Sequence, residues 1–268
     1  MDNINVKNLH FGYTKEEEIL ANINLSFDSR STAIIGQNGA GKTTFVKLLK
    51  GLLKPTSGDI YINGINTKET TTAKLASHIG MVFQNPNDQI FKNKVIDEVM
   101  FGPLNIGQSH SEANKNAIAA LKTVDLLEKS DSNPYDLSLS ERKLISIASI
   151  VAMNTKIIIF DEPTIAQDYA GKEKIKSIIR NLAAEGKLVL TIIHDMDFVA
   201  ETFERTLVFS KGKVLLDDTT RAVYAYKELL ESAYLEQPHV TQLCNRLGMK
   251  ETFLTVEEFV AHKKNNAR

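Results

Sequence analysis

The chain has 268 residues and an almost balanced charge, with 32 lysines and arginines against 33 aspartates and glutamates. This balance gives no reason to expect nucleic acid or an acidic membrane face as the main partner. The single cysteine, Cys244, excludes an internal disulfide and favours a reducing cytosol. The sequence opens without a secretory signal, and no apolar run approaches the length that crosses a bilayer. We therefore expect any membrane role to act through another chain.

Alternating apolar residues near the start of the chain predict half-buried strands. Residues 4–9, 23–27 and 60–62 show this pattern, and the last of them ends at Asn63 and Gly64, which favour a hairpin turn. We expect a small antiparallel layer here, wrapped around the segment between the second and third strands.

That segment carries the sharpest motif in the chain, G-x-x-x-x-G-K-[ST]. It follows the apolar run 32–35 and leads into Phe45, Leu48, Leu49 and Leu52, whose spacing predicts one face of a helix. A strand, a glycine loop and a helix form the context that binds the phosphates of a nucleoside triphosphate. The loop consists of Gly36, Gln37, Asn38, Gly39, Ala40, Gly41, Lys42, Thr43 and Thr44. Lys42 adds a full positive charge, and the Thr43 hydroxyl can bind Mg²⁺.

Residues 86–152 have a different character, because strand patterns stop there. Ser109 and Glu112 have the spacing of a capping box and predict a helix with Ala117, Ile118 and Leu121 on its inner face. We interpret this stretch as an inserted helical subdomain.

Buried-strand patterns reappear at 157–160, 188–193, 207–209 and 214–216. Helical stretches between the first two predict a mainly parallel sheet with crossover helices. Short helices are expected at 226–234, 240–247 and 256–262. The expected division is a larger domain over residues 1–220 and a small C-terminal helical domain over 221–268.

Polar residues stand where several of these strands end. Asp161 could hold Mg²⁺ and Glu162 could deprotonate an attacking water, although two solvated acids at a strand end are the simpler alternative. His194 could contact a terminal phosphate, but a lone histidine is more often structural. Gln84 could meet metal or water, although Gln at a strand end is common. Tyr13 could offer its ring to adenine or pack in the antiparallel layer.

Taken in this order, the motifs resemble the nucleotide-binding subunit of an ATP-binding cassette (ABC) transporter over nearly the whole chain. The resemblance implies an α/β fold with a RecA-like, phosphate-loop core and an ATPase activity that uses Mg²⁺. It implies that Tyr13 stacks on adenine and that residues 36–44 hold the phosphates of ATP. It also implies that Thr43, Gln84 and Asp161 bind the metal.

The same resemblance assigns the remaining site residues. Glu162 is implied as the catalytic base and His194 as the switch histidine. Asp168 is implied to lie in the loop that crosses to a partner subunit. Ser138 belongs to the signature loop, which contacts ATP bound to that partner.

A closer resemblance is to the ATPases of energy-coupling factor transporters, which take up vitamins, cobalt or nickel. It is carried by residues 83–91, 95–99 and 101–103, and by 238–243 in a segment associated with ATPase pairing. It implies a second homologous ATPase, a transmembrane coupling subunit that docks near Gln84–Phe101, and a substrate-binding membrane subunit. The chain would then lie at the cytoplasmic face of the cell membrane.

The signature loop departs from the family pattern Leu-Ser-Gly-Gly-Gln. Here it reads Leu137, Ser138, Leu139, Ser140 and Glu141. Leu139 adds bulk, and the carboxylate of Glu141 is unfavourable if it faces phosphates. We therefore expect an asymmetric heterodimer with two unequal ATP sites. The active site would be the one that combines this chain's phosphate loop, residues 36–44, with the partner's signature loop. The alternatives are a nucleotide-sensing regulatory half and a cassette ATPase of repair or translation.

Overall fold

The computed structural model describes residues 3–249 and 251–266. Residues 1, 2, 250, 267 and 268, which fall within the expected domains 1–220 and 221–268, lie outside the described part. None of the helices within the described ranges combines the length and the apolar character that a membrane span requires.

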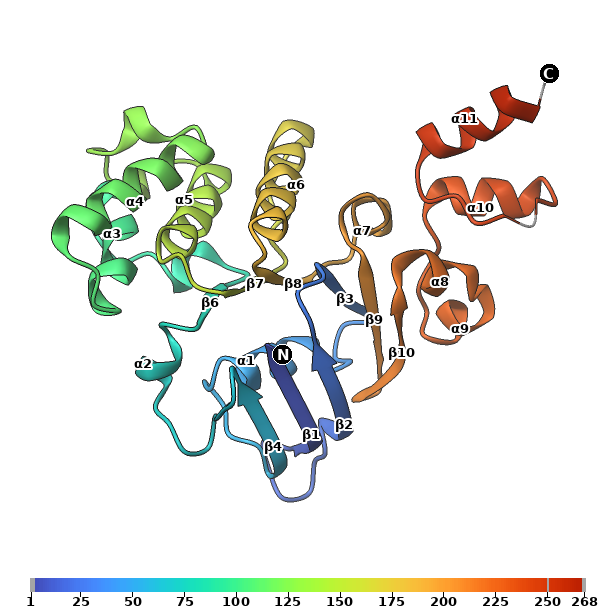
Figure 1. The fold of residues 1–268 in the computed structure, drawn as a ribbon, viewed down its shortest axis with the longest axis horizontal. Helices are drawn as coiled ribbons and strands as arrows, with labels where there is room; N and C mark the ends of the chain where they lie inside the picture. The colour runs from blue at the N-terminus through green and yellow to red at the C-terminus, as the bar shows by residue number, and fades with distance from the viewer. Residues whose placement is uncertain (1–2, 250, 267–268) are drawn as a thin grey trace.

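An antiparallel sheet with the strand order β2-β1-β4-β5 forms the lower part of the molecule in Figure 1. Its strands are β1 (Ile4–Phe11), β2 (Leu20–Phe27), β4 (Ser57–Ile62) and β5 (Ile65–Asn66). The expected alternation is confirmed, since Ile4 pairs with both Phe27 and Ile62 and all three are fully buried. Asn63 and Gly64 join β4 to β5 with positive φ angles of 48° and 82°, as a hairpin turn requires.

The second sheet has the order β10-β9-β3-β8-β7-β6 and is parallel except for its edge strand β10. The predicted parallel sheet is therefore confirmed. Its strands are β3 (Thr32–Gly36), β6 (Ile79–Val82), β7 (Ile157–Asp161), β8 (Leu188–Ile192), β9 (Arg205–Ser210) and β10 (Lys213–Thr219).

Both faces of the parallel sheet are covered, which explains why its strands read as continuous apolar runs. In β7, Ile157 and Ile159 face a core shared with the antiparallel sheet, whereas Ile158 and Phe160 face a core shared with the helices. The carboxyl ends of these strands therefore form an edge between two packed layers.

Helix α1 (Lys42–Leu49) follows the glycine loop and buries Phe45, Leu48 and Leu49. The expectation for Leu52 is wrong, because this residue lies beyond the helix and is exposed. The helix ends at Gly51, whose φ of 74° and bond from Leu52 N–H to Lys47 C=O form a Schellman cap.

The helical subdomain comprises α3 (Val95–Asn105), α4 (His110–Thr123) and α5 (Leu139–Ala152), which lie together at one end of the molecule (Figure 1). Ser109 caps α4 by accepting a bond from Glu112 N–H, as expected. Ile118 is a correction: it is only half-buried, and the inner face is formed by Ala113, Ala117, Ala120 and Leu121. Two short turns of helix, η2 (Leu127–Lys129) and η3 (Pro134–Asp136), connect α4 to α5. Two others lie earlier in the chain, namely α2 (Thr72–Leu75) before β6 and η1 (Pro86–Asp88) between β6 and α3.

Helices α6 (Tyr169–Ala184) and α7 (Met196–Thr202) lie on the parallel sheet, and the chain then ends in four helices at the opposite end from α3–α5 (Figure 1). These four are α8 (Thr220–Ala225), α9 (Lys227–Ser232), α10 (His239–Arg246) and α11 (Val256–Asn266). A small separate core of Val240, Cys244 and Phe253 holds the last two together.

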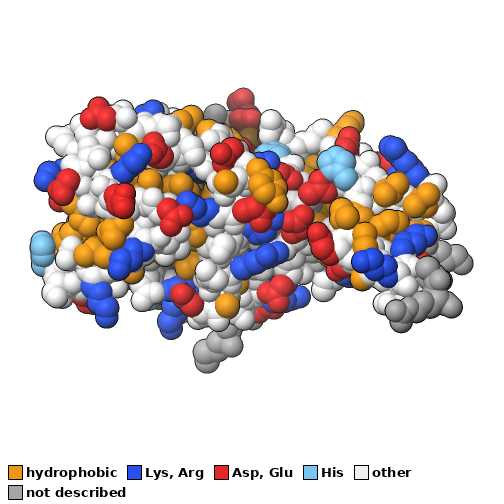
Figure 2. All heavy atoms as spheres, turned by 90° about the horizontal axis from the view of Figure 1, so that it is seen from above, with side chains coloured by type: hydrophobic (Ala, Val, Ile, Leu, Met, Phe, Trp, Pro, Cys, Tyr) orange, Lys and Arg blue, Asp and Glu red, His pale blue; other side chains and the backbone are white. Residues whose placement is uncertain are grey.

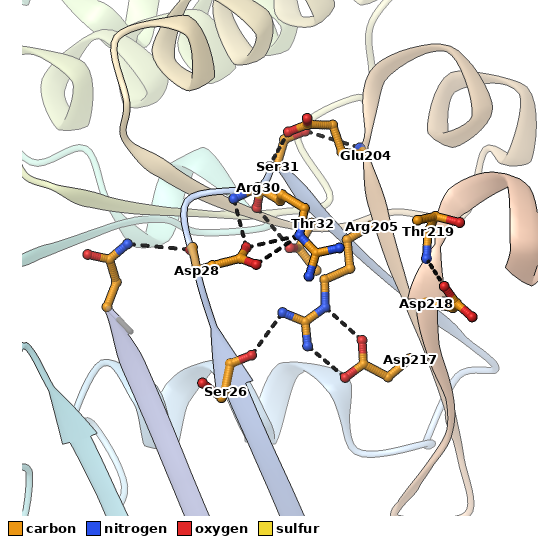
Figure 3. Close-up of polar contacts among 11 residues, drawn as sticks. Ser26, Asp28, Arg30, Ser31, Thr32, Glu204, Arg205, Asp217, Asp218 and Thr219 are labelled. Carbon is orange, nitrogen blue, oxygen red and sulfur yellow. Dashed lines mark hydrogen bonds and ion pairs between the residues drawn. The ribbon is translucent and has the colours of Figure 1, made fainter. Parts of the chain in front are cut away.

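Arg205 joins the two sheets (Figure 3). Its guanidinium donates two 2.6 Å bonds to the carboxylate of Asp217 on β10 and one 2.8 Å bond to the Ser26 carbonyl on β2. It also lies over the ring of Phe27. This bidentate pair between a buried guanidinium and an exposed carboxylate fixes the antiparallel layer against β9 and β10.

Candidate nucleotide-binding site

The glycine loop from Gly36 to Thr44 connects β3 to α1 and is closed by its own lysine. The Lys42 ammonium donates to the carbonyls of Gly36 at 2.7 Å and Gln37 at 2.8 Å. Gly41 takes φ +97° at the helix start, a conformation that a side chain would strain. Burial lowers the pKa of Lys42, and the nearby carboxylates of Glu162 and Asp161 oppose this shift. A buried cation is thus held beneath a helix N-terminus, which favours anions.

A cleft of about 400 Å³ opens over this loop. Predicted site residues from four regions of the chain line it, namely Tyr13, Asn38, Gly39, Gly41, Lys42, Thr43, Thr44, Gln84 and Glu162. A neighbouring cleft of about 550 Å³ brings Gly36, Gln37, Asn38 and His194 together with residues 234–237 and His239 near the C-terminus. The structure therefore gathers most of the predicted residues around one loop.

Glu162 lies at the centre of this arrangement. Gln84 donates its side-chain amide to one carboxylate oxygen of Glu162 at 2.9 Å, and His194 Nε2 lies 3.1 Å from the other. The Glu162 backbone has a φ of +47° and donates its N–H to the Ile192 carbonyl at the end of β8. Strain of this kind in a non-glycine residue is often found at functional sites. Three residues that follow β6, β7 and β8 thus meet because parallel strands end at one edge.

Asp161 is buried beside the loop, at 2% exposure. Burial raises its pKa first, the Glu162 carboxylate raises it further, and Lys143 and Thr43 oppose the shift. One of its carboxylate oxygens, Oδ1, has no hydrogen-bond partner among the described residues. Since an unpartnered buried carboxylate oxygen is costly, this atom fits a divalent cation held between Asp161 and Thr43.

The ring of Tyr13 stands at the mouth of the cleft. It is 58% exposed, its hydroxyl lies 3.3 Å from Thr44 Oγ1, and Phe11 packs against it edge to face. The ring therefore packs on the antiparallel layer and still has an exposed surface that a ligand could contact. The structure is compatible with both alternatives for Tyr13, packing and adenine stacking.

Asp168 and Ser138 lie outside this cleft and cap helices. Asp168 accepts a 2.8 Å bond from Gly171 N–H at the start of α6, and Ser138 accepts one from Glu141 N–H at the start of α5. Both residues are exposed.

Comparison with known proteins decides the family. Residues 20–165 match the sequence pattern of the ABC transporter family. A putative ABC transporter ATP-binding protein of Pyrococcus furiosus is 42% identical over 258 residues, which cover 96% of this chain and 98% of that protein. This chain belongs to the ABC transporter family.

Within that family, this ABC ATPase is similar to the proteins of energy-coupling factor transporters. It is 34% identical to energy-coupling factor transporter ATP-binding protein EcfA2 of Clostridium perfringens over 98% of this chain and 95% of that protein. The solved structure of cbiO1 from Clostridium perfringens, part of the ABC transporter complex cbiONQ, superposes with a TM-score of 0.77. That comparison has 30% identity and covers 91% of this chain and 99% of cbiO1. The chain is the ATP-binding subunit of such a transporter, and its ATP hydrolysis is coupled to transport.

Sequence reasoning missed one buried residue of this ABC ATPase, Lys143 on α5. Its ammonium donates to the backbone carbonyls of Phe83, Gln84 and Asp161. Burial lowers the pKa of Lys143 to about 8, against the opposing charges of Asp161 and Glu162. The available signal was a lysine beside the apolar run from Leu144 onwards, on the inner face of a helix.

Proposed function

We propose that this ABC ATPase drives uptake of a vitamin or a metal ion as part of an energy-coupling factor importer at the cytoplasmic face of the cell membrane. Its proposed partners are a second homologous ATPase, a transmembrane coupling subunit and a substrate-binding membrane subunit. The similarity to EcfA2 and to cbiO1, which is part of a larger transporter complex, supports this proposal.

The observation that carries the proposed chemistry is the position of Glu162 between Gln84 and His194, at the wall of the cleft. In this proposal the loop from Gly36 to Thr44 binds the phosphates of ATP, and Tyr13 stacks on adenine. Glu162 accepts a proton from the attacking water. Gln84 and His194 hold its carboxylate in one orientation, which matters because misplaced catalytic groups lose much of their effect.

Magnesium has a proposed place in the same cleft. Thr43, Asp161 and the amide oxygen of Gln84 are ligands of the type that Mg²⁺ prefers, and the unpartnered Oδ1 of Asp161 supports the assignment. When bound, the ion would neutralise charge on the outer phosphates.

The proposed docking region for the transmembrane subunit, Gln84–Phe101, presents an exposed aromatic pair. Phe91 and Phe101 pack edge to face with centroids 4.6 Å apart, and the Lys92 ammonium lies about 5 Å from both rings. The buried carboxylate of Glu98 accepts bonds from the backbone N–H groups of Phe91 and Lys92. The pair is thus held rigidly at the surface, as an anchoring contact for a partner helix should be.

The C-terminal helices are proposed to take part in pairing of the two ATPase chains. Figure 2 shows hydrophobic side chains among charged ones over the end of the molecule that carries α10 and α11. The exposed apolar residues of these helices are Leu243, Val256 and Val260, and Leu247 directly after α10 is exposed as well. A cluster of this kind supports a contact surface.

The altered signature loop is the basis for proposing a heterodimer. Ser138 donates its hydroxyl and its N–H to Glu141 Oε2 at 2.8 and 2.9 Å, and Lys129 pairs with the other carboxylate oxygen. Lys129 first, and then Ser138, lower the pKa of Glu141 to about 2, so the carboxylate is ionised at neutral pH. Although it is partly exposed, this carboxylate is bonded to groups of its own chain, and it occupies the donors of Ser138. We infer that this loop serves the partner's nucleotide poorly, while Asp168 still reaches across.

The test is the Glu162→Gln variant in the complex purified with its natural partners from membranes. We expect binding of MgATP within about twofold of wild type and turnover reduced about a hundredfold or more. Turnover that stays at the wild-type level would show that the site at this chain's phosphate loop, residues 36–44, is not the active one. It would instead support the second candidate, a regulatory half that binds ATP while its partner hydrolyses it.

A further inference from the structure

Lys143 is the most deeply buried lysine near the nucleotide site, at 1% exposure. Its ammonium donates to the carbonyls of Phe83 and Gln84 at 2.8 Å each and to that of Asp161 at 3.3 Å. These three bonds use all three of its donors. No carboxylate lies within ion-pair distance of it in the part of the chain that the structure describes. All hydrogen bonds of this buried cation therefore go to backbone carbonyls, while the carboxylates of Asp161 and Glu162 act on its charge from beyond ion-pair distance.

The three acceptors belong to the segments that carry the proposed catalytic groups. The hydrogen-bonded ladder between β6 and β7 ends at the pair Val82 and Phe160. Phe83, Gln84 and Asp161 come directly after that point, so the β6–β7 ladder no longer joins these two segments, although Asp161 still pairs with Ile192 of β8. Lys143 donates to all three carbonyls and thereby joins the two segments where the β6–β7 pairing stops.

A second contact strengthens the same connection between α5 and the strand end. Gln89 accepts a bond from Phe83 N–H at 3.1 Å and donates its amide to the Ser146 carbonyl and to Ser149 Oγ on α5. The carbonyl of Phe83 is thus bonded to α5 directly, and its N–H is bonded to α5 through Gln89. Because α5 begins at the signature loop, these bonds connect that loop to the cleft.

A neutral donor would satisfy these carbonyls without the cost of burying an unpaired charge. What the cation adds is three strong, convergent bonds from one atom, which fix two segments relative to each other. Gln84 in turn holds the carboxylate of Glu162. We propose that Lys143 is a positioning residue that sets Gln84 and Asp161, and through Gln84 the carboxylate of Glu162, according to the position of α5.

This proposal rests on the proposed roles of Gln84, Asp161 and Glu162. Its test compares Lys143→Met and Lys143→Arg in the assembled transporter. Lys50→Met is the matched control, because the half-buried Lys50 also donates to a backbone carbonyl, that of Ile79 at the far end of β6. Binding of MgATP and the ATPase rate are measured for each variant.

We expect Lys143→Met to bind MgATP within about twofold of wild type and to lose turnover by about tenfold to a hundredfold. Lys143→Arg, which keeps the charge and the donors, should recover most of that loss. Lys50→Met should retain the wild-type rate. If Lys143→Met yields no folded protein, Lys143→Gln takes its place, because its amide keeps the site polar but supplies only two donors for three carbonyls. We then expect a smaller loss of turnover, with binding of MgATP still within about twofold of wild type.

A Lys143→Met rate equal to that of Lys50→Met would overturn the proposal. Equal losses of affinity and turnover would also overturn it, because they indicate a structural role only. The Glu162→Gln variant distinguishes a failure of the proposed function from a failure of the role proposed for Lys143. A wild-type rate in Glu162→Gln overturns the proposed function, whereas a wild-type rate in Lys143→Met beside an inactive Glu162→Gln overturns only the role of Lys143.

Discussion

Ser140 and Gln167 exchange two hydrogen bonds. The Ser140 hydroxyl donates to Gln167 Oε1 at 3.0 Å, and Gln167 Nε2 donates to the Ser140 carbonyl at 3.2 Å. The family pattern places glycine at position 140, which has no hydroxyl, so the first of these bonds depends on the departure from that pattern. The pair joins the altered signature loop to the segment before Asp168, the two parts of the chain proposed to face a partner's nucleotide.

A double-mutant cycle tests whether this contact couples the two loops. Ser140→Gly, Gln167→Ala and the double variant should show a coupling energy of about 1 kcal/mol in urea unfolding of the full chain. Ser140→Gly should also change the ATPase rate of the assembled complex. If the changes in the free energy of unfolding are additive, Ser140 and Gln167 are not energetically coupled, and the contact does not stabilise the fold.

Glu141→Gln tests whether the carboxylate of the altered loop limits nucleotide contact. The substitution removes a negative charge and releases the Ser138 hydroxyl from a charge-assisted bond. We expect ATP to drive association of the two ATPase chains more strongly, by about fivefold in apparent affinity, measured by analytical ultracentrifugation with a hydrolysis-deficient partner. Glu128→Gln on the neighbouring short helix is the charge-matched control. Equal association in the two variants would exclude Glu141 as the limiting group.

The contact between His239 and Asp197 should make attachment of α10 depend on pH. Asp197 pairs with the His239 imidazole and raises its pKa above 6.5, and Glu236 and Asp195 add to the shift. A raised pKa means that the stabilisation is complete below about pH 6.5 and is lost as the pH rises through the higher, folded value. Hydrogen-exchange protection factors of residues 239–246 should therefore be larger at pH 6 than at pH 9. His239→Gln should remove this difference, and a pH difference that persists in the variant would contradict the assignment.

The bridge between the two sheets predicts a stability effect that is separate from activity. Asp217→Ala leaves the buried guanidinium of Arg205 without its bidentate partner, and we expect a loss of about 2–4 kcal/mol in the free energy of unfolding. The double variant Arg205→Met with Asp217→Ala should recover part of this loss, because no unpaired charge remains. Chemical denaturation of the three proteins measures the difference, and a loss below about 0.5 kcal/mol would place the pair among surface ion pairs.

Local patterns predicted the fold to the extent that they encode local structure. The alternation around Ile23 and the glycine loop before Lys42 gave the correct elements, because neighbouring residues determine strand faces and loop curvature. Leu52 and Ile118 were placed wrongly on buried faces. In the first case Gly51, a C-terminal cap signal, ends the helix before Leu52. In the second, packing rather than spacing selected which residues of α4 turn inward.

The sequence by itself determined that this chain binds a triphosphate, because the loop from Gly36 to Thr44 and its flanking strand and helix are contiguous. Only the tertiary structure decided that Lys143 lies beneath Gln84 and Asp161, and that Glu141 turns toward Lys129. These contacts join residues from separate elements, and sequence spacing does not specify them. They arise when whole elements pack, since a buried charge then takes whichever donors or acceptors the packed layers bring within reach.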